Sequence, residues 1–161
     1  MNQNIRKGFT LIELLVVIGI IGILAAVVLV AVNPGRQFAQ ARDTQRRSDL
    51  LQITNAIYQF AAEHEGNLPG TDDTVAISNF PTTPTCIGTG GSCFDLGAAG
   101  EVDGNSDGIT EPTVPTYIAA LPEDPSVGIT ADTGYTIYVD TDGRVVASAS
   151  GELAGIITVQ R

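Results

Sequence analysis

Gly8-Phe9-Thr10-Leu11-Ile12-Glu13-Leu14-Leu15 is the stretch of sequence that decides the fold of this chain. It opens an apolar run, and the 19 residues from Leu14 to Val32 include no charged residue and no polar side chain. A helix needs roughly 20 apolar residues to cross a bilayer core of about 30 Å. In lipid every backbone polar group must be bonded within the segment, so helix is favoured despite the β-branched residues and glycines of this run. We therefore predict a membrane-spanning helix over residues 9–32.

Charged residues flank the start of this helix. Arg6 and Lys7 precede it, and basic residues next to a membrane span favour the cytoplasmic side for that end of the chain. Glu13 lies just inside the apolar run, where a carboxylate is costly and usually has a function. The alternative is that Glu13 is an ordinary helix-end charge that reaches the lipid headgroups.

A second helix is predicted after Asn33-Pro34-Gly35, which interrupts the apolar run. Proline removes a backbone donor and clashes one turn back, so we expect either a simple kink or a melted turn at the membrane edge. Residues 33–65 are then predicted to form an amphipathic helix, which ends at Gly66. The spacing of three and four that indicates a one-sided apolar face is found at Leu50, Ile53, Ile57 and Phe60.

The head, residues 66–161, divides by composition into two parts. Residues 71–115 are rich in Gly, Thr, Pro, Ser and Asp and are predicted to be irregular. Residues 116–161 are predicted to form an antiparallel sheet, with a hairpin turn at Asp142-Gly143. The strand-like segments are Tyr117–Leu121, Tyr135–Val139, Arg144–Ser150 and Ile156–Gln160. The predicted fold is therefore α+β, a long N-terminal helix kinked near Pro34 and packed on a small antiparallel sheet.

The charge of the chain is unevenly distributed. Its formal net charge is −10, and from Glu63 onward there are fifteen acidic residues and two bases. Such a head repels phosphates, so it is not expected to bind nucleic acid. The sequence has no nucleophile–base pair, phosphate loop or zinc spacing, and helix-end placement is enough to explain the single histidine, His64. We expect a protein that is not an enzyme.

Cys86 and Cys93 are the only cysteines of the chain. Neither has a histidine or a further cysteine at metal-ligand spacing. If this part of the chain lies outside the cytoplasm, a disulfide that closes a short loop is expected. The alternative is two unpaired thiols.

An acidic segment in the head is a candidate cation site. Asp103, Asn105 and Asp107 place oxygen ligands at alternate positions before a glycine, which is the pattern of the first half of a calcium loop. The bidentate glutamate expected at position twelve is missing, and Glu111 stands at position nine instead. Calcium held by Asp103, Asn105, Asp107 and Glu111 is one interpretation, and a solvated acidic turn is the other.

The run Lys7–Ile18 resembles the N-terminal signature of type IV pilins and of the pseudopilins of type II secretion. This resemblance implies cleavage after Gly8 by a prepilin peptidase, N-methylation of the new N-terminus at Phe9, and assembly into a helical homopolymer. The amine created at Phe9 would pair with Glu13 of a neighbouring subunit. The implied organisation is a leader over residues 1–8, a membrane and filament-core helix over 9–32, an amphipathic helix over 33–65 and a head over 66–161.

The function expected on these grounds is that of a major pilin. The chain would be anchored in the cytoplasmic membrane before assembly and would then form part of an extracellular filament, with the assembly machinery as a further partner. One alternative is a pseudopilin of a type II secretion system. Another is a minor adhesive or calcium-binding pilin that remains anchored in the membrane.

Overall fold

The computed structural model describes residues 8–71, 79–102 and 110–161, with the backbone alone for residues 101, 102, 110 and 111. The chain divides into two units, Met1–Phe38 and Ala39–Arg161, which we describe separately. The helices and strands are α1 (Leu11–Val32), α2 (Pro34–Glu63), β1 (Thr85–Cys86), β2 (Gly100–Val102), β3 (Thr110–Pro112), α3 (Thr113–Thr116), β4 (Tyr135–Val139), β5 (Val145–Ser150) and β6 (Ile156–Gln160).

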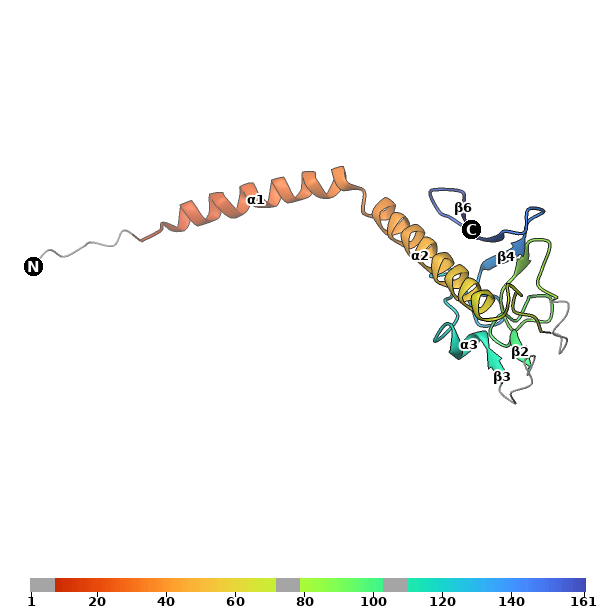
Figure 1. The fold of residues 1–161 in the computed structure, drawn as a ribbon. Helices are drawn as coiled ribbons and strands as arrows, with labels where there is room; N and C mark the ends of the chain where they lie inside the picture. The colour runs from red at the N-terminus through yellow and green to blue at the C-terminus, as the bar shows by residue number, and fades with distance from the viewer. Residues whose placement is uncertain (1–7, 72–78, 103–109) are drawn as a thin grey trace, which may run out of the picture. The chain divides into compact units, whose positions relative to one another are not determined.

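The first unit is built around α1 (Figure 1). Within the part of the chain that the structure describes, this is the one helix that is long and apolar enough to cross a membrane. None of its residues is buried by the protein. An apolar helix without a protein partner requires lipid or other helices around it, which agrees with the predicted membrane segment.

Asn33 separates the two helices and has a left-handed backbone, with φ of 46°. Its carbonyl oxygen accepts from the Arg36 N–H at 3.1 Å, and its side-chain Oδ1 lies 3.4 Å from the same nitrogen. Pro34 occupies the first position of α2, where a missing N–H costs nothing. The predicted interruption is therefore confirmed, but it is limited to Asn33: α1 ends at Val32, α2 begins at Pro34, and there is no melted turn between them.

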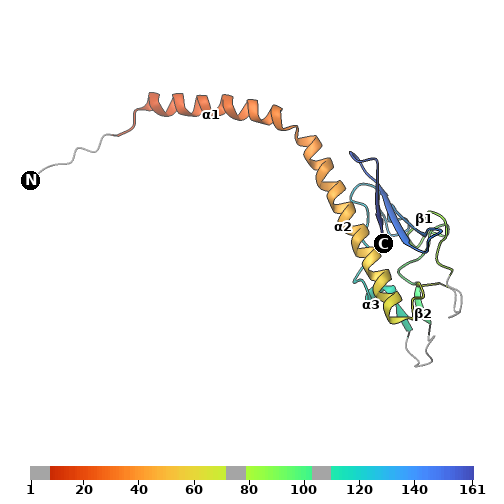
Figure 2. The same cartoon turned by 45° about the horizontal axis from the view of Figure 1, so that its top comes forward.

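The second unit is a four-stranded antiparallel sheet covered by α2 (Figure 2). The strand order is β1-β4-β5-β6, and the register pairs Tyr135 with Ala149 and Ala149 with Ile157. Asp142-Gly143 forms the turn between β4 and β5, and Gly143 has the positive φ of 79° that favours glycine there. The α+β fold predicted from the sequence is thus confirmed.

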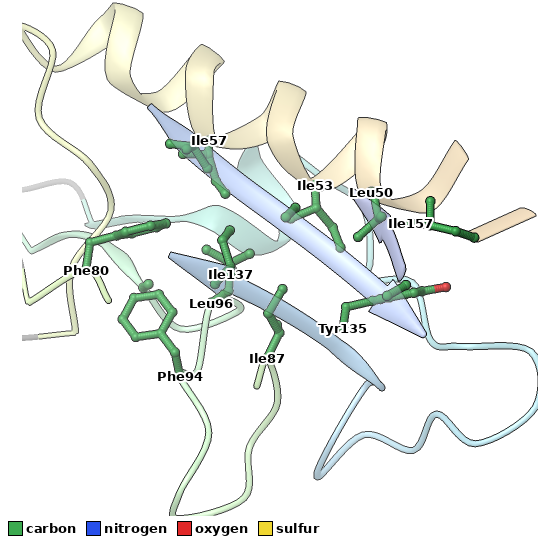
Figure 3. Packing of buried hydrophobic residues seen from close by; sticks show 14 residues of the cluster. Leu50, Ile53, Ile57, Phe80, Ile87, Phe94, Leu96, Tyr135, Ile137 and Ile157 are labelled. Carbon is green, nitrogen blue, oxygen red and sulfur yellow. The ribbon is translucent and has the colours of Figure 1, made fainter. Parts of the chain in front are cut away.

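The core lies between α2 and the inner face of this sheet. The side chains of Leu50, Ile53 and Ile57 project from α2 toward Tyr135 and Ile137 of β4 (Figure 3). The loop residues Phe80, Ile87, Phe94 and Leu96 close the same cluster. Burial of one such aliphatic side chain contributes roughly 1.5–3 kcal/mol, so this cluster supplies the main driving force for folding of the head.

Two details of the predicted head are wrong. Tyr117–Leu121 is not a strand, because Pro115 and Pro122 bracket it and proline offers no N–H to a ladder. Instead the N–H groups of Tyr117 and Ile118 both donate to the Thr113 carbonyl, which makes a turn. Conversely, the region 71–115 contains the paired strands β2 and β3 as well as β1, which its composition did not indicate.

Candidate functional site

The residues around the predicted cleavage point are accessible. Gly8, Phe9 and Thr10 are exposed and precede the first turn of α1, and the Phe9 side chain is 88% exposed. Thr10 has an extended backbone, with φ of −84° and ψ of 152°. The chain just before α1 is therefore open to a processing enzyme.

Thr10 and Glu13 form a capping box at the start of α1. The Thr10 hydroxyl accepts from the Glu13 N–H at 3.3 Å, and Glu13 Oε2 accepts from the Thr10 N–H at 3.1 Å and from the Thr10 hydroxyl at 3.0 Å. Helix N-termini leave backbone donors without partners, and this exchange satisfies two of them. Sequence reasoning overlooked Thr10, although Thr-x-x-Glu before an apolar run predicts the motif.

This geometry places the one acidic residue of α1 beside the chain end that cleavage would create. Glu13 lies in the first helical turn, and the N-terminus of a helix favours negative charge. An amine at Phe9 would stand one residue before Thr10, at the same end of the helix. A carboxylate and an amine attract each other more strongly in an apolar medium than in water, although desolvation reduces the net gain.

The head contains a second polar constellation, which the sequence did not indicate. Arg46 of α2 is buried, and its guanidinium contacts Asp124 at 2.6 and 3.1 Å, Asp43 at 2.8 Å, and Glu152 at 3.2 Å. The hydroxyl of Ser126 accepts a further bond at 2.9 Å. One cation thus links the helix to the 124–126 loop and to the turn between β5 and β6.

The carboxylates around Arg46 have lowered pKa values. Backbone N–H groups of Glu152, Leu153 and Ala154 donate to Asp43, and with Arg46 they lower the pKa of Asp43 to about 2. The pKa of Glu152 also falls to about 2, mainly because Arg42 donates two hydrogen bonds to it. The network is therefore fully ionised at neutral pH.

A buried hydroxyl lies next to this network. Tyr135 of β4 donates to Asp49 Oδ2 at 2.7 Å, and Gln45 donates to the other oxygen of the same carboxylate at 2.7 Å. Burial, followed by the bond to Asp49, raises the pKa of the Tyr135 phenol. The polar residues Asp43, Arg46 and Asp49 of α2 are therefore buried, and they pack on polar partners of the head.

Cys86 and Cys93 form a disulfide. The bond closes a short loop whose flanks are paired, since Phe94 N–H donates to the Cys86 carbonyl at 2.8 Å. Ile87 and Phe94, adjacent to the two cysteines, belong to the core. Of the two alternatives that the sequence left open, the structure has the disulfide.

The candidate calcium loop lies largely outside the described residues. Asp103, Asn105 and Asp107 belong to the part that the structure does not describe, and Glu111 is described by its backbone alone, in β3. Within the described residues, one group of Cys, His, Asp and Glu atoms lies close enough to hold a metal, Cys86, Cys93 and Asp132. The disulfide already occupies both sulfur atoms of that group, so the group is not available to a metal. Calcium at the acidic loop is not tested by the described residues and stays a prediction.

His64, the single histidine, lies just after α2 and stacks on Phe60, with ring centroids 3.9 Å apart. Its Nδ1 lies 2.8 Å from the Phe60 carbonyl oxygen. The side chain of Tyr117 packs edge-on against Phe60, with ring centroids 5.4 Å apart. These contacts give His64 a structural role at the end of the helix.

Comparison with protein families matches residues 3–29 to the prokaryotic N-terminal methylation motif. The match spans Gly8, Phe9, Glu13 and most of α1. Comparison with curated proteins and with solved structures gives no match. The motif and the geometry of the α1 N-terminus therefore point to the same segment.

Proposed function

We propose that the mature form of this chain is the structural subunit of a helical filament, because the methylation motif at residues 3–29 supports a prepilin like those of type IV pilins and pseudopilins. The observation that carries the proposal is this motif on an apolar helix that the protein itself leaves uncovered. Such a helix requires lipid before assembly and other helices after it. The proposed role is polymerisation, with no catalytic step.

Processing and assembly use the same few residues in this proposal. A prepilin peptidase cuts after Gly8, and the new N-terminus at Phe9 is methylated. The chain is anchored in the cytoplasmic membrane by α1 until it joins the filament outside the cell. There the Glu13 carboxylate pairs with the amine of a neighbouring subunit, and this pairing selects one register because an unpaired carboxylate among apolar helices is costly.

We favour a major pilin of a type IV pilus over a type II secretion pseudopilin. The support comes from residues 80–102 and 110–116, which place a disulfide-closed loop and the β2–β3 ribbon on the head. Such elaboration suits a subunit whose head forms the outer surface of a fibre. Strict dependence of head folding on calcium would instead favour the pseudopilin. A minor, membrane-anchored adhesive pilin would be scarce and would form no homopolymer.

Mass spectrometry of purified filaments tests the processing step. We expect a mature chain that begins with a methylated Phe9. A filament subunit that still carries residues 1–8 would contradict the proposal. Electron microscopy with a label on the head then separates the alternatives, because long surface fibres are expected for a pilus and not for a secretion pseudopilus.

Substitution of Glu13 tests the pairing step and separates it from helix capping. Glu13→Gln keeps a side-chain acceptor for the Thr10 N–H, since glutamine also serves in capping boxes, but it removes the charge. Glu13→Ala removes both. We expect both variants to insert into the membrane and both to lose assembly. Normal filaments from Glu13→Gln would show that the charge is not needed and would overturn the pairing.

A further inference from the structure

Strand β6, Ile156–Gln160, is an edge of the head sheet and has one strand neighbour, β5. Two observed contacts show which residues of β6 form backbone hydrogen bonds with β5. Arg161 N–H donates to the Val145 carbonyl at 3.2 Å, and Gly151 N–H donates to the Gly155 carbonyl. Directly opposed residues in an antiparallel ladder alternate between bonded and non-bonded pairs. In the observed register, the bonded pairs therefore also include Ala147 with Val159 and Ala149 with Ile157.

The residues between these pairs have their backbone groups on the free side. In β6 they are Ile156, Thr158 and Gln160, whose N–H and C=O groups point away from β5. Among the residues that the structure describes, none supplies a hydrogen-bond partner to these groups. All three residues are exposed, and the Ile156 side chain is 76% exposed. The free edge of β6 is thus a row of backbone hydrogen-bond donors and acceptors, spaced so that another β-strand could pair with them.

Natural edge strands usually carry a feature that prevents pairing, such as a charged residue, a proline or a bulge. The sequence Ile-Ile-Thr-Val-Gln of β6 has neither charge nor proline, and its register with β5 is continuous. The opposite edge, β1, is two residues long and is preceded by Pro84, which cannot donate. A second strand can therefore be added to this sheet at β6 and not at β1.

We propose that the β6 edge is a pairing site for β6 of a second copy of this chain, antiparallel and centred on Thr158. In this register Thr158 faces its counterpart, and Ile156 of each copy faces Gln160 of the other. No like charges meet, and threonine pairs are favourable across strands. The edge is thus complementary to itself, whereas β1 of another copy offers two residues and a proline.

The contact is a weak one by its size. A five-residue edge buries less than the roughly 1,200–2,000 Å² of a stable interface. Pairing therefore needs the high local concentration that the membrane plane or neighbouring fibres provide. A twofold contact cannot repeat between consecutive subunits of a polar filament. The proposed β6–β6 contact therefore joins two heads from separate filaments or two membrane-anchored precursors. Its formation does not depend on filament assembly.

Cysteine crosslinking in the full-length membrane-embedded chain tests this contact. The two native cysteines are joined to each other in a disulfide, so a cysteine added by substitution is the only free thiol of the chain. Thr158→Cys places two thiols at the centre of the proposed pair, within the 4.4–6.8 Å Cα separation that disulfides accept. Thr83→Cys is the matched control, because Thr83 is equally a surface threonine and precedes the β1 edge. We expect at least about tenfold more covalent dimer from Thr158→Cys. Equal yields, or none from either variant, would overturn the proposal.

A second arm tests the register and does not depend on Thr158. A mixture of Ile156→Cys and Gln160→Cys chains should give covalent heterodimers, while each variant alone should give few. The reverse pattern would mean parallel pairing and would refute the antiparallel edge. An unchanged melting temperature of each variant shows that the head is folded. The result is independent of filament formation, because a chain unable to polymerise through Glu13 should give the same crosslinks.

Discussion

Replacement of Arg46 by methionine should strongly destabilise the head. The side chain is 2% exposed and is the shared cation of Asp43, Asp124 and Glu152. Methionine can fill much of the space but cannot neutralise the carboxylates. The head would then contain buried acidic groups without a cation.

The expected cost follows from what remains after the change. Removing one partner of a buried ion pair typically costs about 3–5 kcal/mol. Asp124 would keep the Ser126 and Val127 N–H groups as donors, at 2.8 and 3.2 Å, so the lower end of that range applies. A loss of about 3 kcal/mol corresponds to a melting temperature lower by about 10 °C or more for a domain of this size.

Thermal unfolding of the purified full-length chain in detergent measures this difference, and Arg47→Met is the matched control. Arg47 is the exposed neighbour of Arg46 and makes no ion pair among the described residues. Its replacement should change the free energy of unfolding by no more than about 0.5 kcal/mol. Hydrogen exchange gives a local readout, because the amides of Glu152, Leu153 and Ala154 are held by Asp43. Equal melting temperatures for the two variants would refute the reasoning.

Three further outcomes are expected. The pKa values of Asp43 and Glu152, lowered from 3.8 and 4.5 to about 2, should make the head lose stability as the pH falls from about 4.5 to about 2, with no change due to these groups above pH 5. Urea titrations across this range measure the loss. The double variant Cys86→Ser, Cys93→Ser should lower the free energy of unfolding by about 2–3 kcal/mol, since the bridged residues are 7 apart. Tyr135→Phe should cost about 1.5–3 kcal/mol, because its hydroxyl donates to a buried carboxylate.

Each of these outcomes has a result that contradicts it. Stability that is flat down to pH 2 would mean that the carboxylates are not held as described. A reductant that leaves the melting temperature of the wild-type chain unchanged would show that the disulfide does not stabilise the head. Tyr138→Phe is the control for Tyr135→Phe, because Tyr138 lies on the other face of β4 and is only partly buried. Equal effects of the two would exclude the buried hydrogen bond.

The N-terminal unit could be predicted from the sequence because its forces are local. A continuous apolar run specifies a helix in lipid whatever the rest of the chain does. Asn33-Pro34-Gly35 is a stop and start signal within three residues, and the structure has the break there. Only the Thr10 cap was overlooked, and its motif was present in the sequence.

The head could be predicted only in part because its decisive contacts are distant in sequence. The alternation in β4 and the Asp142-Gly143 turn were sufficient for the hairpin. Arg46 and Asp124 are 78 positions apart, and nothing near either residue indicates that they meet. The β2–β3 ribbon is likewise made by a ladder across a stretch of low strand propensity, where pairing outweighs local preference.

The network of ion pairs around Arg46 also has a consequence for a head under tension. Arg42, Asp43 and Arg46 lie in the N-terminal half of α2, so a pull on the chain from that side loads them before it loads the apolar core. Their partners lie in two separate loops, which share the load in parallel. Sliding α2 along the sheet would therefore require several charge-assisted bonds to break together, and such shear is the mode in which short bonds resist force best. These ion pairs hold α2 to the rest of the head near the N-terminal end of the helix, where a pull along the chain from α1 would arrive.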